Sequence, residues 1–453
     1  MQKDINNLRR IYFLQLVFVF VMAAFIRVSY FEQTTYEYAI RGDGLSYVRY
    51  AHNMITYGTF SKDRDTETPV ADSFWSPGYP TLVALALLVE KTGFLSGYEL
   101  LMYLQVILGA STAVITLLLG RLFLSPFYAF SAAILVTVSP HLVTIGGLVL
   151  TETLSCFLVL LAVYFFSIAY RADKNSWLVM AGIFFALAYL VNPVVFFAPF
   201  FLCLAAFMLR AKYQQLTAKN GLKSILVFCL VFGLICLSWS ARNAISVPVD
   251  KPSSSSRLFE NLVIGSHSNF YKVLRNDYRD PNNPAILDLK SLNGSYRAFA
   301  NLFIERVHAD PLHYAKWYFI DKPLLLWSWS ILVGSGDIYI NPVIDSPYQD
   351  SILFVSSYKF MKLVHQCLFV FAIFSICFFR FSATKADDIP VFLYILLVYV
   401  SSVYVISQAE PRYSIPLRPE MYLCALFFLS RFTELLIKPF RQVEAVNTDT
   451  RRL

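Results

Sequence analysis

Charged residues are scarce in this chain of 453 residues. They make up 15% of the sequence and hydrophobic residues 57%, whereas a soluble globular domain carries about 25% charged residues. The apolar residues gather in runs of roughly 16–24, and about 20 consecutive apolar residues are needed to cross the hydrocarbon core of a bilayer. The composition excludes a soluble protein and predicts an all-α polytopic membrane protein.

Signatures of several enzyme and pump classes are also missing. The seven cysteines lie inside apolar runs without a CxxC pair, so we expect neither disulfides nor a cysteine metal site. No Walker A loop, helix-opening GxGxxG, HExxH or GxSxG motif occurs, which argues against nucleotide-driven pumping, redox chemistry and serine hydrolysis. The net charge of +8 reflects loop orientation in such a protein, and we expect no nucleic acid partner.

The apolar runs predict about ten transmembrane helices. Basic residues concentrate in alternate short loops, which places the N-terminus and those loops on the cytoplasmic side. The first run lacks a clear small-residue cleavage site, so we interpret it as a retained anchor rather than a signal peptide. The predicted spans are residues 11–30, 99–119, 124–140, 151–170, 176–191, 193–210, 224–244, 358–379, 389–409 and 415–436.

Two long polar segments interrupt this pattern and are placed on the outer face. Their apolar stretches Tyr79–Val89 and Lys322–Val333 are too short to span, since about eleven helical residues reach only about 16 Å, and we expect them at the membrane interface. The predicted organisation is a cytoplasmic N-terminus (1–10), an N-terminal transmembrane module (11–246) with a first outer loop (31–98), an outer-face loop region (247–350), C-terminal transmembrane helices (351–436) and a cytoplasmic basic tail (437–453).

Two carboxylates at the outer face are candidates for chemistry. Asp43 follows Gly42 at the start of an amphipathic stretch, Leu45–Ile55, in which Tyr47 lies on the apolar face. Glu152 begins the fourth predicted span at the same face. The structural alternatives are an exposed helix N-cap for Asp43 and a favourable interaction with the helix dipole for Glu152.

Two arginines at outer helix ends are candidates for an anionic headgroup. They are Arg242 and Arg412, the latter followed by Tyr413 in a proline-rich polar segment. Arginine near a bilayer is costly unless it is paired or reaches the interface, and its planar guanidinium suits phosphate. The alternatives are snorkelling to the interface, or a salt bridge between Arg412 and Glu410.

The order of these features resembles the GT-C superfamily of lipid-dependent glycosyltransferases, in particular the dolichyl-phosphate-mannose protein mannosyltransferases and the lipid A aminoarabinose transferases. The similarity covers most of the chain. Its motifs are Gly42-Asp43 with Tyr47 and Ala51, Gly58-Thr59-Phe60, Ser76-Pro77-Gly78-Tyr79-Pro80, Ser139-Pro140, Thr151-Glu152-Thr153-Leu154, AYLVNP from Ala188, WSARN from Trp239, Asp310-Pro311 ahead of Lys322 and Trp327, and RYSIPLRP from Arg412.

The resemblance implies a polyprenyl-phosphate-linked sugar donor, used on the outer face of a bacterial inner membrane or in the lumen of the endoplasmic reticulum. The acceptor is a glycan, lipid or protein. We expect Asp43 to act as general base in an inverting transfer, with Arg412, and more weakly Arg242, stabilising the leaving phosphate. Glu152 would orient the acceptor or hold a divalent cation, the one cofactor considered.

Two other classes of function remain open at this stage. A transporter or flippase would place charged residues at the membrane midplane along a path, whereas here the polar groups gather on one face and no internal repeat is visible. A non-catalytic scaffold would tolerate replacement of Asp43 and Arg412.

Overall fold

The computed structural model describes residues 2–64, 66–90, 96–212, 218–268, 282–332, 334–381 and 384–450. The first ten helices are α1 (Gln2–Gln33), α2 (Asp43–Tyr57), α3 (Gly78–Glu90), α4 (Gly97–Gly120), α5 (Pro126–Val138), α6 (Pro140–Thr144), α7 (Glu152–Ala172), α8 (Asn175–Val191), α9 (Ala198–Lys212) and α10 (Ala218–Ser246). The chain is thus helical from its start, as its composition predicts.

The second half continues with shorter helices and three long ones. They are α11 (Ser254–Ser266), α13 (Pro284–Leu292), α14 (Tyr296–Ala309), α15 (Pro311–Lys316), α16 (Lys322–Leu326), α17 (Pro347–Asp350), α18 (Ile352–Phe374), α19 (Ile389–Ile406), α20 (Pro411–Ser414) and α21 (Arg418–Thr450). Two short strands, β1 (Thr35–Tyr36) and β2 (Val343–Asp345), pair antiparallel and join the first outer loop to the second.

Seven of the described helices are long and apolar enough to cross a membrane, and an eighth span results if α5 and α6 count as one. Those two helices meet at a bend of 53°, where Pro140 lacks the backbone N–H that would continue the ladder. Helices occupy all ten predicted positions. The count of ten spans is not confirmed, because α8 is short and α21 is not among the candidates.

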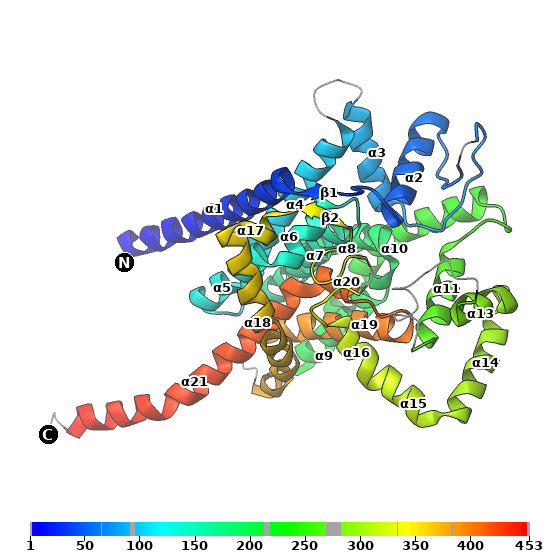
Figure 1. Cartoon of the computed structure of the whole chain (residues 1–453). Coiled ribbons are helices and arrows are strands. Elements are labelled where there is room, and N and C mark those ends of the chain that lie inside the picture. The colour runs from blue at the N-terminus through cyan, green and yellow to red at the C-terminus, as the bar shows by residue number, and fades with distance from the viewer. Residues whose placement is uncertain are drawn as a thin grey trace.

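Small residues let the long helices pack closely in one continuous core. Ala110, Ala113 and Ala162, from α4 and α7, are fully buried there. Helix α21 packs against both α5 and α18 and so joins the two halves of the bundle. In Figure 1, α1 and α21 extend toward one side of the molecule, while α11, α13, α14 and α15 lie on the opposite side.

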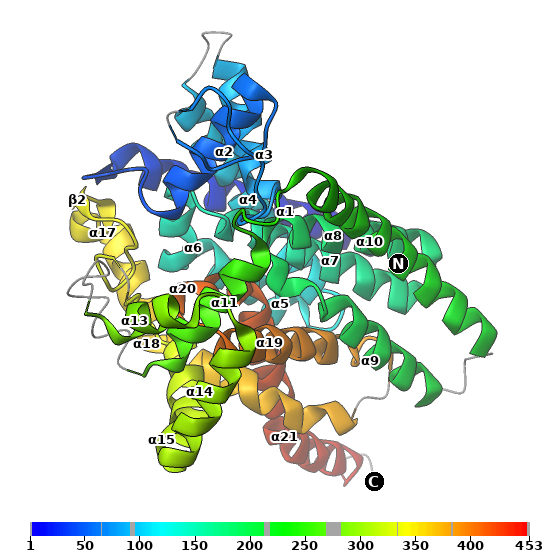
Figure 2. The same cartoon turned by 90° about the vertical axis from the view of Figure 1, so that its right-hand side faces the viewer.

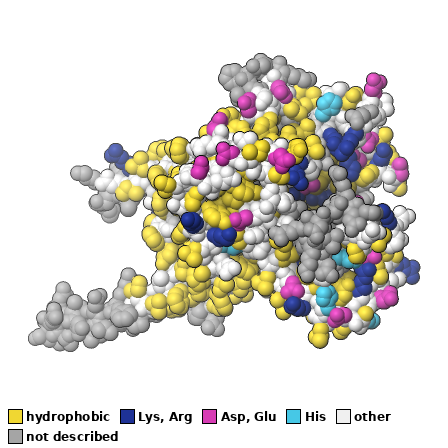
Figure 3. All heavy atoms as spheres, viewed as in Figure 1, with side chains coloured by type: hydrophobic (Ala, Val, Ile, Leu, Met, Phe, Trp, Pro, Cys, Tyr) yellow, Lys and Arg dark blue, Asp and Glu magenta, His cyan; other side chains and the backbone are white. Residues whose placement is uncertain are grey.

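The surface divides in the same way. Figure 3 shows hydrophobic side chains covering the half that carries α1, α5, α18 and α21, while charged side chains gather over the first outer loop and over α11, α13, α14 and α15. The predicted short helix Tyr79–Val89 is present as α3. In the described part of the stretch Lys322–Val333, only Lys322–Leu326 is α-helical. The site described next lies between the long helices and the outer loops.

Candidate functional site

Arg412 lies at the centre of three carboxylates. Its Nη2 forms a close ion pair with Asp43 Oδ2, and its Nε lies 3.5 Å from Glu152 Oε1 and 3.9 Å from Glu410 Oε2. Both glutamates are buried, whereas 27% of the Asp43 side chain is exposed. The structure therefore brings Asp43, Glu152 and Arg412 together, as the sequence analysis expected, and the arginine pairs mainly with Asp43 rather than with Glu410.

The backbone around Asp43 explains its position beside Glu152. Gly42 has a φ of 55° and is the N-cap of α2, a conformation that glycine adopts without strain; the alternative of Asp43 as N-cap is therefore wrong. At Gly44, an added Cβ would lie 3.0 Å from the carbonyl oxygen of Val149. The first turn of α2 thus packs directly on the segment that leads into Glu152.

That segment is held from the other side by Gln105 of α4. The Gln105 amide donates to the carbonyl oxygens of Gly146 and Leu148 at 3.0 and 2.9 Å, and accepts a hydrogen bond from Tyr79 Oη at 2.9 Å. All polar atoms of this buried amide are thereby satisfied, which a membrane protein core requires. The segment before α7 is fixed by α3 and α4 together.

A cavity of about 480 Å³ opens beside Arg412 and Glu152. Tyr47, one turn after Asp43, lines it and packs edge-on against Trp75 at 5.1 Å. Tyr413 also lines it and stacks on Tyr404 at 4.8 Å. The other lining residues are Thr151, Val191, Asn192, Pro193, Val194, Phe196, Phe197, Ser254, Ser255, Arg257, Leu258, Asn261, Tyr399, Val403, Ser407, Gln408 and Pro416.

The sequence analysis missed Arg257, the second cation at this cavity. Its guanidinium lies 3.7 Å from the ring centroid of Trp75, and among the described residues it forms no ion pair. It comes from α11, in the second outer loop, which a parallel bridge from Ser73 to Ser253 ties to the first. No local motif marks it, because its role depends on this contact between two loops.

Residues 79–239, a little over a third of the chain, match the family described as dolichyl-phosphate-mannose-protein mannosyltransferase. The structure is similar to that of the archaeal oligosaccharyltransferase AglB from Archaeoglobus fulgidus, in complex with an inhibitory peptide and a dolichol-phosphate, with a TM-score of 0.51 and 15% identity. That alignment covers 95% of this chain and 52% of AglB. The chain has a GT-C-like fold.

Two further solved structures were matched by the fold of this chain. The apo form of the A. fulgidus oligosaccharyltransferase gives a TM-score of 0.50 at 15% identity, covering 95% of this chain and 52% of that one. ArnT from Cupriavidus metallidurans, bound to undecaprenyl phosphate, gives 0.49 at 12% identity, covering 93% and 60%. No curated protein matches by sequence. The resemblance drawn from the motifs is confirmed, and this chain spans about half the length of AglB.

Arg242 does not join the cluster around Arg412. Its guanidinium donates to the carbonyl oxygens of Asp72 at 2.9 Å and Phe60 at 3.2 Å, and it lies over the rings of Phe60 and Trp239. It therefore fastens the first outer loop to the end of α10. Its predicted contact with a substrate headgroup stays a prediction without support from this position.

No group of three or more metal-ligating side chains occurs within the described ranges. Around Arg412 the three carboxylates converge on the guanidinium rather than on a common point that a cation could occupy. Glu152 as a cation ligand thus stays a prediction.

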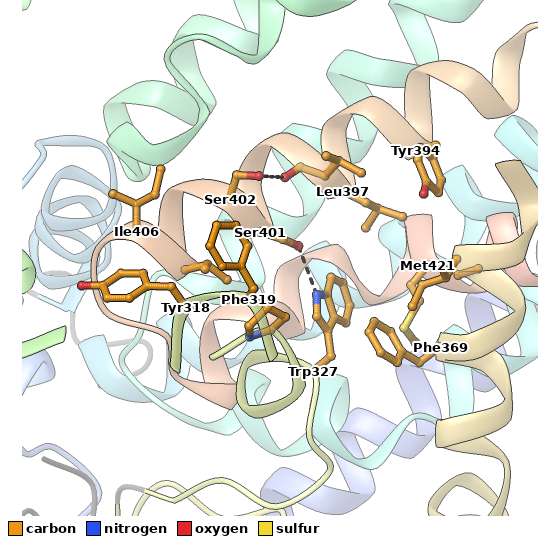
Figure 4. Close-up of a pocket in the computed structure, with 15 residues that line it drawn as sticks. Tyr318, Phe319, Trp327, Phe369, Tyr394, Leu397, Ser401, Ser402, Ile406 and Met421 are labelled. Atoms are coloured by element: carbon orange, nitrogen blue, oxygen red, sulfur yellow. Dashed lines mark hydrogen bonds between the residues drawn. The ribbon is translucent and has the colours of Figure 1, made fainter. Parts of the chain in front are cut away.

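A second cavity of about 470 Å³ lies on the opposite face of α19 and is almost wholly apolar. Figure 4 shows the side chains that line it, with Trp327 donating a hydrogen bond to Ser401 Oγ at 3.1 Å. Phe319, at its edge, is 83% exposed, as expected of a side chain facing lipid. The two cavities flank the end of α19, where Ile406 lines the apolar one and Ser407 the one beside Arg412.

Glu410 gives the site a pH dependence. Burial, together with the charges of Asp43 and Glu152, raises its pKa to about 7 against an opposing effect of Arg412. In the folded protein the neutral form of the Glu410 carboxyl is therefore favoured. The stability that this neutral form gives the fold is lost as the pH rises from the unfolded pKa of 4.5 through about 7.

We expect the midpoint of thermal unfolding of the detergent-solubilised protein to fall between pH 5 and 8. The shift in pKa corresponds to a loss on the order of 3 kcal/mol. In Glu410→Gln, which cannot ionise, the midpoint should depend less on pH over the same range. Equal slopes for the two proteins would show that Glu410 does not titrate there.

Proposed function

We propose that the protein is an integral-membrane glycosyltransferase that moves a sugar from a polyprenyl-phosphate donor to an acceptor hydroxyl. The observation that carries this proposal is the convergence of Asp43, Glu152 and Arg412 beside a cavity that a second arginine, Arg257, also lines. The family match and the dolichol-phosphate in the AglB complex support the donor class. We place the reaction on the outer, periplasmic or lumenal face, and favour a bacterial inner membrane.

The proposed step is an inverting displacement. Asp43 Oδ1, which accepts no hydrogen bond among the described residues, takes the proton of the acceptor hydroxyl. The hydroxyl oxygen forms a bond to the anomeric carbon while the bond from that carbon to the phosphate oxygen breaks. The polyprenyl phosphate leaves with the electron pair, so no nucleotide is needed.

Charge balance favours Arg257 over Arg412 as the cation that receives the phosphate. Arg412 already faces the carboxylates of Asp43, Glu152 and Glu410, so its surroundings disfavour another anion. Arg257 faces the same cavity and packs over the ring of Trp75; the charge of Glu260 also acts on it, but within the described ranges no carboxylate forms an ion pair with it. In this assignment Arg412 is a positioning residue that orients Asp43, and Arg257 takes the role that the sequence analysis gave to Arg412.

Glu152 and the tyrosines complete the proposed substrate site. Glu152 is the carboxylate that lines the cavity itself, and we assign it to orienting the acceptor. Tyr47 and Tyr413 present rings from two sides, and aromatic faces suit the apolar face of a sugar.

The apolar cavity across α19 suits the hydrocarbon chain of the donor. It lies next to the cavity that would hold the phosphate, and its edge is exposed and apolar. Ala372 of α18 is 4% exposed and lines it. Ala372→Phe should fill part of this space and raise KM about tenfold for donors with long isoprenoid chains, with little effect on donors of one or two isoprene units. An equal change in KM for long and short donors would show that the hydrocarbon chain of the donor does not occupy this cavity.

The proposed function is tested with the purified protein in lipid. Free polyprenyl phosphate is measured after incubation with a panel of polyprenyl-phosphate sugars and a crude extract of acceptors. Release with one or more donors is the expected result. If no donor is cleaved, the glycosyltransferase assignment fails, and transport or flipping of a lipid-linked substrate becomes the function to assay.

A further inference from the structure

A third cavity, of about 280 Å³, lies on the other side of α11 from the proposed catalytic cavity. Figure 2 shows α11, α13 and α14 grouped together on the side of the molecule that faces the viewer. Ser255 lines both cavities, whereas Arg257 and Leu258 line only the first and Ser256 and Glu260 only the third. One turn of α11 is thus the wall between them.

The lining of the third cavity mixes one aromatic ring with hydrogen-bonding groups. Tyr296 is 40% exposed, packs edge-on against Phe259 at 5.3 Å and donates through Oη to the carbonyl oxygen of Ser255 at 2.6 Å. Its ring is thereby fixed in place. Ser255, Ser256 and Asn293 supply hydroxyl and amide groups, and Leu289 and Gly294 complete the wall.

Glu260 is the only acidic or basic side chain in this lining. It is half-buried, and the charges of Lys62 and Arg257 act on it from nearby. In the described part of the chain, however, its carboxylate accepts no hydrogen bond and forms no ion pair within contact distance. Its oxygens therefore remain available to accept hydrogen bonds from a ligand that supplies donors. Because the charged group in this lining is an acid, we favour a neutral ligand rich in hydroxyl groups over the phosphate of the donor lipid.

We propose that this cavity binds a neutral sugar ring of the acceptor, which makes the acceptor a glycan. Two hydroxyls of the ring donate to the Glu260 carboxylate, and the apolar face of the ring packs on Tyr296. The first turn of α11 is tied through Ser253 to the first outer loop, so the acceptor is held against the loop that carries Asp43. The assignment of the bound sugar to the acceptor rests on the proposed function, whereas the binding of a sugar in this cavity does not depend on it.

Sugar binding is tested by saturation-transfer difference NMR on the full-length protein in nanodiscs. The probes are methyl mannoside, methyl glucoside, methyl galactoside and N-acetylglucosamine, with glycerol as the small-polyol control. We expect one or more of the sugars to bind, and Glu260→Gln and Tyr296→Ala each to weaken the binding about tenfold or more. Tyr296→Phe, which keeps the ring, should weaken it less than Tyr296→Ala.

Glu305→Gln is the matched control, since Glu305 is exposed on α14 and lines none of the three cavities. Asp43→Asn should leave sugar binding unchanged. The proposal is overturned if no sugar binds the wild type, or if Glu260→Gln and Glu305→Gln behave alike. Donor cleavage, measured separately, reports on the proposed function. If the wild type cleaves donor but binds no sugar, only this inference is refuted. If it binds sugar, loses that binding in Glu260→Gln and cleaves no donor, only the transferase assignment is refuted.

Discussion

Asp43→Asn should lower the rate of sugar transfer by about 10²–10⁴-fold, the usual contribution of a positioned general base. Asparagine has nearly the same shape and can still meet Arg412, but its amide cannot take the proton of the acceptor hydroxyl. The KM for the donor should change little, because in this scheme the phosphate is bound by Arg257 on a different element. The measurement is the initial rate of transfer at saturating donor, with the folded state checked by size-exclusion chromatography.

Glu67→Gln supplies the matched control for that experiment. Glu67 is an exposed acid in the same outer loop, so its replacement changes the charge of the loop equally without touching the cluster, and activity should be retained. A folded Asp43→Asn protein with more than about a tenth of the wild-type rate would exclude Asp43 as the base. Glu152, paired with Arg412, would then be the next candidate for the general base.

Much of the fold could be predicted because the membrane restricts the chain to helices. Runs of apolar residues therefore marked α1, α4, α7, α10 and α19 with small errors at their ends. The predicted span 124–140 ended at Pro140, and the short helix α6 that follows the bend there was not predicted. The number of helices that cross the membrane also depends on how the helices pack, and hydropathy gives no information on packing.

The candidate site could be predicted only in part, for a related reason. Asp43, Glu152 and Arg412 stand at helix ends on one face, so topology alone brings them to the same depth, and charged residues at such depths are few. Arg257 lies in a polar segment where arginine is ordinary, and only the bridge between Ser73 and Ser253 places it at the cavity. Contacts between two long loops leave no periodic signal in a sequence.

Arg257→Ala should reduce transfer by about 10²–10³-fold, the typical cost of removing one preorganised group that stabilises developing negative charge. A leaving phosphate gains charge as the bond to the anomeric carbon breaks, and in a partly enclosed cavity a fixed cation acts on it more strongly than in bulk water. Because the ground-state donor is also anionic, KM should rise as well. Arg257→Lys should recover part of the rate, since it restores the charge but not the planar pair of donors.

Arg412→Ala is expected to act differently, and the comparison separates the two arginines. Without its guanidinium, Asp43, Glu152 and Glu410 face one another without a counter-ion, so their mutual repulsion should displace Asp43 from the position in which it takes the proton. The rate should therefore fall with little specific effect on KM. Arg257→Ala, in contrast, should raise KM as well. Arg297 is an exposed arginine of α14, and Arg297→Ala serves as the control for lost surface charge.

The opposite pattern would reassign the phosphate. If Arg412→Ala raised KM and Arg257→Ala did not, Arg412 would be the residue that binds the phosphate, and the carboxylates around it would have to be neutralised when the donor binds.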